Sequence, residues 1–247
     1  MEEFTVKIAG YAIAIKALYP ETKELFKDYL TKEQSSVAIE SNEEIIALER
    51  KLLREVNVKK KFPIDVFSDA NVESNYFYRE VAEQLSTRGI VLIHGSAVAI
   101  DGEGYIFVAP SGTGKSTHVR LWRKMFGSRV VMINDDKPLL QCSDDGIIVY
   151  GSPWDGKHHL STNIYVPLKA ICFLEREKDN HIEPITAIEG FMPMLKAVYH
   201  SKEAEREAYI LKSLQCIRQK INFYHLCCNM ELSAAMVSYE GMNHNCL

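Results

Sequence analysis

The residues best suited to chemistry lie in the run Ala109-Pro-Ser-Gly-Thr-Gly-Lys-Ser-Thr117. An apolar stretch, 105–108, precedes this run and a helix-like stretch follows it, so the order is strand, glycine-rich loop, helix. Successive backbone N–H groups of such a loop converge at the positive end of a helix, which suits a polyphosphate. The usual motif has glycine in place of Ala109, but the two glycines nearest the phosphates are present. The sequence therefore predicts a nucleoside triphosphate site formed by Ser111, Gly112, Thr113, Gly114, Lys115, Ser116 and Thr117.

Two aspartates supply the second half of the predicted site. In this loop motif Lys115 provides a cation for the β- and γ-phosphates, and the Ser116 hydroxyl binds Mg²⁺. Asp135 and Asp136 follow the hydrophobic run 129–133, at the carboxyl end of an expected strand, where open α/β sheets bind ligands. A carboxylate there can hold Mg²⁺ or accept a proton from an attacking hydroxyl. Adjacent strand residues point in different directions, so we expect the two carboxylates to have different roles.

The polar stretch 151–159 is too rich in turn-forming residues for a core element, yet it contains a tryptophan. Such a composition is typical of a surface loop that covers a ligand. We therefore expect Trp154 and Lys157 to close over the nucleotide or the acceptor. The alternative, in which Trp154 anchors the loop to the core, is about equally compatible with the sequence.

The remaining pattern predicts the elements that must position these residues. We expect an α/β fold with a mixed sheet, in which an N-terminal α+β subdomain, 1–69, precedes a nucleotide-binding domain, 70–247, with the connection at 57–69. The first part reads as a strand or bent hairpin arm, a short helix from Pro20, and a helix over 42–56 that begins with a Ser41/Glu44 capping box. The second part reads as short strands around the loop helix, followed by a C-terminal run of helices and strands. The expected helices are 72–88, 203–220 and 232–239. The expected strands are 90–94, 96–100, 105–108, 129–133, 139–142, 147–150, 169–174 and 223–228.

Composition narrows the class of function. The chain has 29 basic and 33 acidic residues and a net charge of -4, which argues against a nucleic-acid partner. No apolar run suits a membrane span and the first residues do not resemble a signal peptide, so we expect a cytoplasmic protein without a membrane partner. The six cysteines form no Cys-x-x-Cys pair, and we expect reduced thiols. His225, Cys227 and Cys228 read as part of a buried strand rather than as a metal site.

These motifs resemble a known family. Ile93-His94-Gly95, then Ser-Gly-x-Gly-Lys-Ser, then Asp-Asp after the next strand is similar to the catalytic domain of HPr kinase/phosphorylase. That family shares its nucleotide-binding fold with ATP-dependent phosphoenolpyruvate carboxykinase, and the resemblance covers residues 90–140. The Arg-Gly-Leu-Gly signature used in HPr recognition is absent. The Gly-x-Pro-Trp-Asp-Gly-Lys loop and the small N-terminal domain look closer still to HPr-kinase-like proteins that accompany bacterial peptide-modification systems.

The resemblance implies an ATP- and Mg²⁺-dependent kinase that phosphorylates a hydroxyl, serine above all, of a peptide or protein. It implies that Asp135 accepts the proton of the acceptor hydroxyl, that His94 orients this carboxylate or the acceptor, and that Asp136 and Ser116 hold Mg²⁺. Two alternatives stay open: a small-metabolite enzyme of the carboxykinase type, and an ATP-binding sensor or peptide-delivery protein without turnover. The sequence also leaves open a homo-oligomer.

Overall fold

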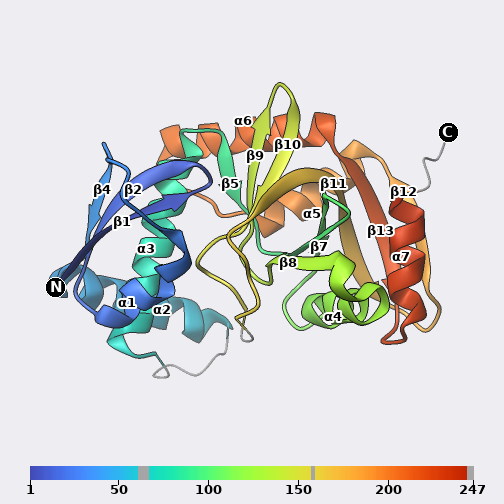
Figure 1. Cartoon of the computed structure of the whole chain (residues 1–247), viewed down its shortest axis with the longest axis horizontal. Helices are drawn as coiled ribbons and strands as arrows, with labels where there is room; N and C mark the ends of the chain where they lie inside the picture. Colours follow the sequence, from blue (N-terminus) through green and yellow to red (C-terminus); the bar gives the residue numbers. More distant parts are fainter. Residues whose placement is uncertain (61–66, 157–158, 244–247) are drawn as a thin grey trace. The chain divides into compact units, whose positions relative to one another are not determined.

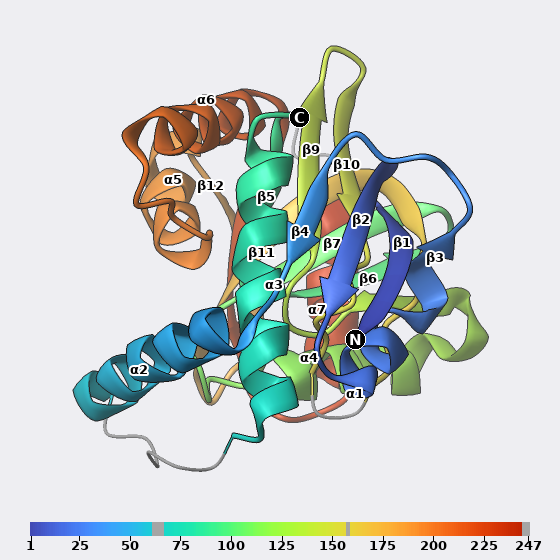
Figure 2. The same ribbon diagram turned by 90° about the vertical axis from the view of Figure 1, so that its left-hand side faces the viewer.

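The computed structural model in Figure 1 and Figure 2 describes residues 1–60, 67–156 and 159–243. The chain forms two compact units, Met1–Gln84 and Leu85–Leu247. This division falls near the end of helix α3 (Asp69–Ser86), whereas the sequence-based boundary at residue 69 assigns α3 to the second domain. Most of the predicted connection, 61–66, lies outside the described residues, and α2 (Glu43–Lys60) continues past its expected end at 56.

The first unit is a small mixed sheet with helices. The predicted hairpin arm is a complete hairpin, because Ala9 and Gly10 adopt positive φ angles of 47° and 84° between two antiparallel strands. The sheet order is β3-β1-β2-β4. Phe26 packs edge-on against Phe77 of α3, with ring centroids 6.2 Å apart, in the core of this unit. Its other elements are β1 (Glu2–Ile8), β2 (Tyr11–Ala17), α1 (Pro20–Leu25), η1 (Lys27–Tyr29), β3 (Leu30–Thr31) and β4 (Ala38–Glu40).

The predicted capping box at the start of α2 is wrong. Asn42 caps the helix instead, because its side-chain oxygen accepts a hydrogen bond from the Ile45 N–H at 2.9 Å. The Ser41 hydroxyl donates to the buried carboxylate of Glu73, which also accepts hydrogen bonds from the Leu18 N–H (2.7 Å) and the Thr22 hydroxyl. A buried carboxylate requires several hydrogen-bond donors. Because the Ser41 hydroxyl is one of these donors, it does not cap the helix.

The second unit is a mixed α+β structure built on nine strands, which confirms the predicted mixed sheet. Its strands run in the order β5-β9-β10-β11-β7-β6-β8, and β13 pairs with β11 and with β12. The elements in chain order are β5 (Ile90–Leu92), β6 (Ser96–Ile100), β7 (Glu103–Val108), α4 (Lys115–Phe126), η2 (Gly127–Arg129), β8 (Val130–Asn134), β9 (Leu139–Ser143), β10 (Gly146–Tyr150), β11 (Tyr165–Arg176), β12 (His181–Ile185), α5 (Ala187–Ala197), α6 (Ala204–Lys220), β13 (Asn222–Cys228) and α7 (Ser233–Asn243).

Helices cover both faces of this sheet (Figure 1). Alternation along β7 sends Tyr105 and Phe107 to the face covered by α4 and α7, and Ile106 and Val108 to the face covered by α5 and α6. Trp122 of α4 is fully buried, with its ring 5.2 Å from the ring of Phe107. The loop before α4 therefore starts from a strand that is buried on both sides.

Strand β11 belongs to two regions of the sheet. Its first residues pair antiparallel with β10, as in Tyr150↔Tyr165, and its later residues run parallel to β7 and β13. The pairing with β7 shifts between Leu168 and Ala170, which is a local irregularity of the strand. This change of partners places the carboxyl end of β11 beside that of β7.

The expectation of reduced thiols is wrong for one pair. Cys142 of β9 and Cys216 of α6 form a disulfide, with Cα atoms 6.2 Å apart and a separation of 74 positions in sequence. Spacing along the chain could not indicate this pair, because the packing of α6 beside β9 brings the two residues together. Among the described helices, none is both long and apolar enough to cross a membrane.

Candidate functional site

The glycine-rich loop connects the end of β7 to the start of α4. Gly112 and Gly114 adopt positive φ angles of 81° and 123°, which L-residues with a side chain rarely adopt. A Cβ atom built on either glycine would meet no protein atom within 4 Å, so the space in front of the loop is open. Helix α4 begins at Lys115, and its amino-terminal N–H groups lack intrahelical partners. This geometry fits the predicted cradle for an anion.

Lys115 is a buried cation at the base of the loop. Its Nζ donates to the Ala109 carbonyl at 2.8 Å and lies 3.2 Å from Nε2 of His94. Burial lowers the pKa of Lys115, although the nearby negative charge of Asp136 and Asp135 acts in the opposite direction. The ammonium group is therefore held close to both aspartates, in surroundings where an additional anion would be strongly attracted.

His94 links Lys115 to Asp136. The Nδ1 of His94 lies 2.9 Å from Oδ1 of Asp136, so an Nδ1–H that donates to this carboxylate leaves Nε2 to accept from Lys115. Lys137 donates to the other Asp136 oxygen at 2.7 Å. Burial opposes ionisation of Asp136, but the His94 hydrogen bond and Lys137 outweigh it and lower the pKa of this carboxyl. The two basic side chains thus favour the ionised form of Asp136.

Asp135 has a different partner. Its Oδ1 accepts a hydrogen bond from the hydroxyl of Ser96, a fully buried residue, at 2.8 Å. Gly156 approaches from the other side, since a Cβ atom there would lie 2.9 Å from Oδ2 of Asp135. The structure therefore brings His94 to Asp136 and Ser96 to Asp135, so the two aspartates have different partners.

Asn134 organises both the aspartate turn and the loop that follows β10. Its Oδ1 accepts from the N–H groups of Asp136 (2.8 Å) and Lys137 (2.6 Å), while its Nδ2 donates to the Trp154 carbonyl (3.3 Å). Trp154 is buried, which favours the anchoring alternative for this side chain in the conformation seen here. Lys157, the other residue predicted for a closing loop, lies outside the described residues. Sequence reasoning missed Asn134, although an asparagine before a turn is a known signal.

Arg176, at the end of β11, donates hydrogen bonds to the backbone of the glycine-rich loop. Its Nε donates to the Thr113 carbonyl at 2.7 Å, and its Nη2 donates to the Gly112 carbonyl. A cavity of about 410 Å³ lies beside this contact, lined by Thr117, His118, Cys228 and Asn229 among others. No sequence signal identified Arg176, because it lies 64 residues from Gly112 and meets the loop only through the parallel pairing of β11 with β7.

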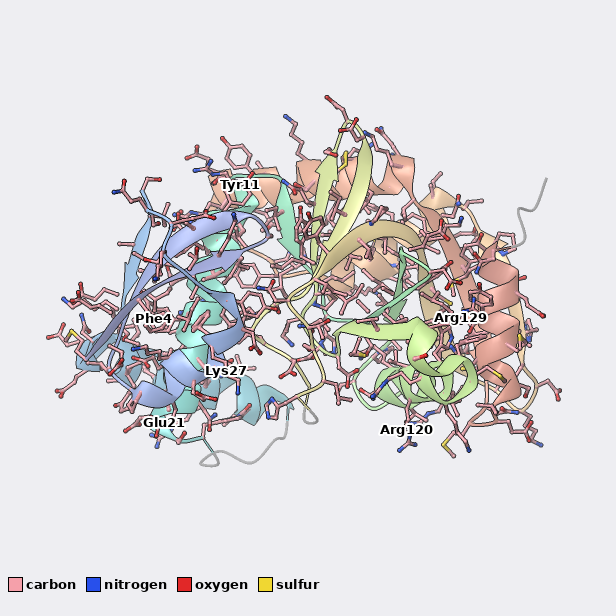
Figure 3. All side chains as sticks on the ribbon, in the orientation of Figure 1. Phe4, Tyr11, Glu21, Lys27, Arg120 and Arg129 are labelled. Carbon is pink, nitrogen blue, oxygen red and sulfur yellow. A yellow bond between two sulfur atoms is a disulfide. The ribbon has the colours of Figure 1, made fainter. Side chains whose placement is uncertain are left out.

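The remaining predicted residues lie around the loop. Ser116 is exposed in the first turn of α4, and no hydrogen bond in the described part of the chain joins it to Asp136. Arg120 lies on the outer side of α4, away from the sheet (Figure 3). Arg129 forms an ion pair with Asp101 rather than facing the loop. The cluster of arginines that a dicarboxylate would need is therefore not assembled by these residues.

Comparison with known proteins identifies the family of the chain. No curated protein matches the chain. One solved structure, the HPr(Ser) kinase/phosphatase from Coxiella burnetii, aligns with 10% sequence identity and a TM-score of 0.35, covering 62% of this chain and 95% of that one. At this TM-score the likeness decides nothing about the site. The family described as "SynChlorMet cassette protein ScmC" matches residues 70–239, which is more than half of the 247 residues. The chain therefore belongs to the ScmC family of SynChlorMet cassette proteins.

Proposed function

We propose that this protein is an ATP- and Mg²⁺-dependent kinase that transfers the γ-phosphate to a hydroxyl, that of serine, in a peptide or protein. One observation carries the proposal: the loop with buried Lys115 and the carboxylate of Asp135 lie at the same edge of the sheet. Strands β7 and β8 both pair antiparallel with β6, so they are parallel and their carboxyl ends meet at this edge. A phosphate donor bound at the loop would thus lie beside a group able to accept a proton.

The loop fits a nucleotide triphosphate. The open space in front of Gly112 and Gly114 lets the backbone approach phosphate oxygens, and Lys115 would neutralise charge on the β- and γ-phosphates. The Ser116 hydroxyl and the ionised Asp136 are oxygen donors of the kind that Mg²⁺ prefers, so these two residues would hold the ion. Mg²⁺ bound there would offset the negative charge that develops on the phosphates during transfer.

Asp135 is the proposed proton acceptor. Ser96 fixes Oδ1. Oδ2, beside which Gly156 packs, is the oxygen that would accept the proton of the acceptor hydroxyl. We assign His94 a positioning role: it joins Lys115 to Asp136 and so holds the cation and the metal-binding carboxylate in place. This modifies the expectation that His94 orients Asp135.

The choice of a peptide or protein acceptor rests on the family and on the resemblance to HPr-kinase-like proteins of peptide-modification systems. The carboxykinase alternative is weaker, because Arg120 points away from the sheet, Arg129 is paired with Asp101, and Arg176 binds loop carbonyls. A nucleotide sensor without turnover would need the same loop but not Asp135. The variant that separates these functions is therefore Asp135→Asn.

The test is incubation of the full chain with γ-labelled ATP and Mg²⁺, with serine-containing peptides, with small acids, and with no acceptor. We expect label on a peptide hydroxyl. Asp135→Asn should bind ATP like the parent but transfer label about 10²- to 10⁴-fold more slowly, because it keeps the shape and loses the basicity. Lys115→Ala should abolish detectable transfer. Asp136→Asn should raise the Mg²⁺ concentration needed for half-maximal rate.

Two surface variants serve as controls. Lys124→Ala lies on the same helix as Lys115, and Asp144→Asn lies in the exposed β9–β10 turn; both should behave like the parent. Label on a small acid alone would support the carboxykinase-like alternative, and ATP binding without transfer to any acceptor would support the sensor. Normal transfer by Asp135→Asn, or its repair by added Mg²⁺, would remove Asp135 from the role of proton acceptor.

A further inference from the structure

A second cluster of reactive side chains lies on the sheet face that α5 and α6 cover in part. Its members are Glu175 at the end of β11 and His225 and Cys227 of β13, and one ligand atom from each lies within 4.8 Å of the others. Glu175 pairs with Cys227 in the parallel register of β11 and β13, so both side chains point to the same face. None of the three belongs to the proposed kinase machinery.

The cluster begins where the helical cover ends. Phe173 and Phe223, the preceding residues of this face on β11 and β13, stack at 6.0 Å and are buried beneath α5. The next positions along the same face are polar, and Glu175 is exposed while His225 is half-buried. Cys227 is only 6% exposed, so its sulfur lies at the bottom of the cluster with the other groups above it.

His225 has a carboxylate at each ring nitrogen. Its Nε2 lies 2.9 Å from Glu175, and its Nδ1 lies 3.7 Å from Glu183, which β12 places opposite His225. Histidines that bind a metal through one nitrogen usually donate the other N–H to a carboxylate, which fixes the ring orientation. Glu183 is placed for that supporting role at Nδ1, whereas Glu175 lies at Nε2.

We propose that Glu175, His225 and Cys227 bind one divalent transition-metal ion, with Zn²⁺ as the best match, and that Glu183 holds the imidazole in position. A thiolate, an imidazole and a carboxylate form a ligand set that zinc accepts readily and that Mg²⁺ and Ca²⁺ do not favour. Ligands about 2.0–2.3 Å from a tetrahedral zinc lie roughly 3.3–3.8 Å apart. The three ligand atoms here lie within 4.8 Å of one another, so binding would draw them together by about 1 Å or more.

Three protein ligands leave one tetrahedral position for water or another ligand. His225 and Glu175 line a cavity of about 690 Å³ that also reaches Ser111 and Gly112 of the phosphate loop. Two of the three proposed ligands therefore border a space shared with the loop. Cys228, the next residue along β13, belongs to the cluster on the opposite face of the sheet and cannot contribute a ligand.

The test uses the full chain, freed of metal with a chelator and titrated with Zn²⁺ and separately with Co²⁺ in the absence of nucleotide. We expect one Zn²⁺ per chain, and a thiolate-to-cobalt charge-transfer band in the near ultraviolet. Cys227→Ser should lose the band, whereas Cys228→Ser, its neighbour on the other face, should keep it. Glu183→Gln should weaken Zn²⁺ binding by about 10- to 100-fold while the band remains.

Glu175→Gln provides a variant that does not depend on a buried position, because its side chain is exposed and its loss should leave folding intact. We expect it to weaken Zn²⁺ binding at least as much as Glu183→Gln does, with an unchanged circular dichroism spectrum. A parent protein that binds no Zn²⁺, a charge-transfer band that survives Cys227→Ser, or equal Zn²⁺ affinity of parent and Glu175→Gln would each overturn the site. These measurements do not involve phosphate transfer, so they test the metal site independently of the kinase proposal.

Discussion

His118, in the second turn of α4, is a buried neutral imidazole. Its ring meets Phe107 edge-on at 4.6 Å, and its Nε2 lies 3.0 Å from the Ser238 hydroxyl of α7. Burial lowers its pKa to about 4. The neutral ring therefore helps to join α4, which carries Lys115, to α7.

This burial predicts a loss of stability in mild acid. Above pH ~6.5 the ring is neutral in both the folded and the unfolded chain and costs nothing. As the pH falls from about 6.5 towards 4, the unfolded chain binds a proton that the folded chain does not, so the free energy of unfolding decreases by roughly 3 kcal/mol in total. Urea denaturation between pH 7.5 and 4.5 should show a steeper decrease for the parent than for His118→Gln. Equal slopes would mean that His118 does not titrate as described.

At the scale of single residues, the sequence could name candidate site residues but not the side chains that contact them. The loop motif and the Asp-Asp pair identified Lys115, Asp135 and Asp136. The contact of Ser96 with Asp135 depends on the pairing of β6 with β8, whose register shifts between Ala97 and Val98. Such an irregularity is a property of the sheet and leaves no signature in the local pattern.

At the scale of elements, the glycine-rich loop depends on the strand beside it. Arg176 donates hydrogen bonds to two loop carbonyls that would otherwise face solvent or one another. A charged donor that binds two carbonyls narrows the range of loop conformations, and a loop already in its binding conformation loses less entropy when it binds a ligand.

We therefore expect Arg176→Ala to weaken ATP binding by roughly 3- to 10-fold, about 1 kcal/mol, because Arg176 is exposed and water replaces part of each hydrogen bond. Arg176→Lys keeps the charge but not the planar group that reaches both carbonyls, so it should recover little affinity. Titration with a fluorescent ATP analogue measures the effect, and Arg120→Ala, an exposed arginine on α4, is the control. Unchanged affinity in Arg176→Ala would show that the loop is stable without this contact.

Helix termini illustrate what local sequence can and cannot predict. Thr186 and Glu189 have the Thr-x-x-Glu spacing of a capping box, and this box forms at the start of α5, where both residues are exposed. The similar pattern at Ser41 fails, because the buried Glu73 attracts its hydroxyl. A capping signal thus holds where no buried group competes for the same side chain.

At the scale of the whole molecule, the sequence predicted most elements of the second unit but not the order of its strands. The sequence did not predict strand β12, because Pro184 and exposed charged residues interrupt the alternation of apolar and polar residues. The strand lies at the edge of the sheet, where proline is tolerated. The pairing of β11 with strands distant in sequence was equally hidden, and with it the contacts of Arg176 and Glu175.

The disulfide predicts a dependence of stability on redox conditions. A disulfide between Cys142 and Cys216, which are 74 positions apart in sequence, restricts the unfolded chain. In the chain-entropy account this restriction stabilises the fold by up to about 4 kcal/mol. Reductant should therefore lower the free energy of unfolding of the parent, as measured in urea, and should leave Cys142→Ser unchanged. A parent that is insensitive to reductant, or peptide mapping that finds both thiols free, would contradict the pairing.

Because β11 pairs with different strands along its length, insertions and deletions within it should be poorly tolerated. The strand joins β10 on one side of its irregularity and both β7 and β13 on the other. Because strand side chains alternate, an insertion or deletion of one residue after position 170 would exchange the faces of Glu175 and Arg176. One such change would remove Arg176 from the glycine-rich loop and Glu175 from His225 and Cys227. Natural length variation among members of the family should accordingly be concentrated in the connections that flank β11, and be absent from the strand itself.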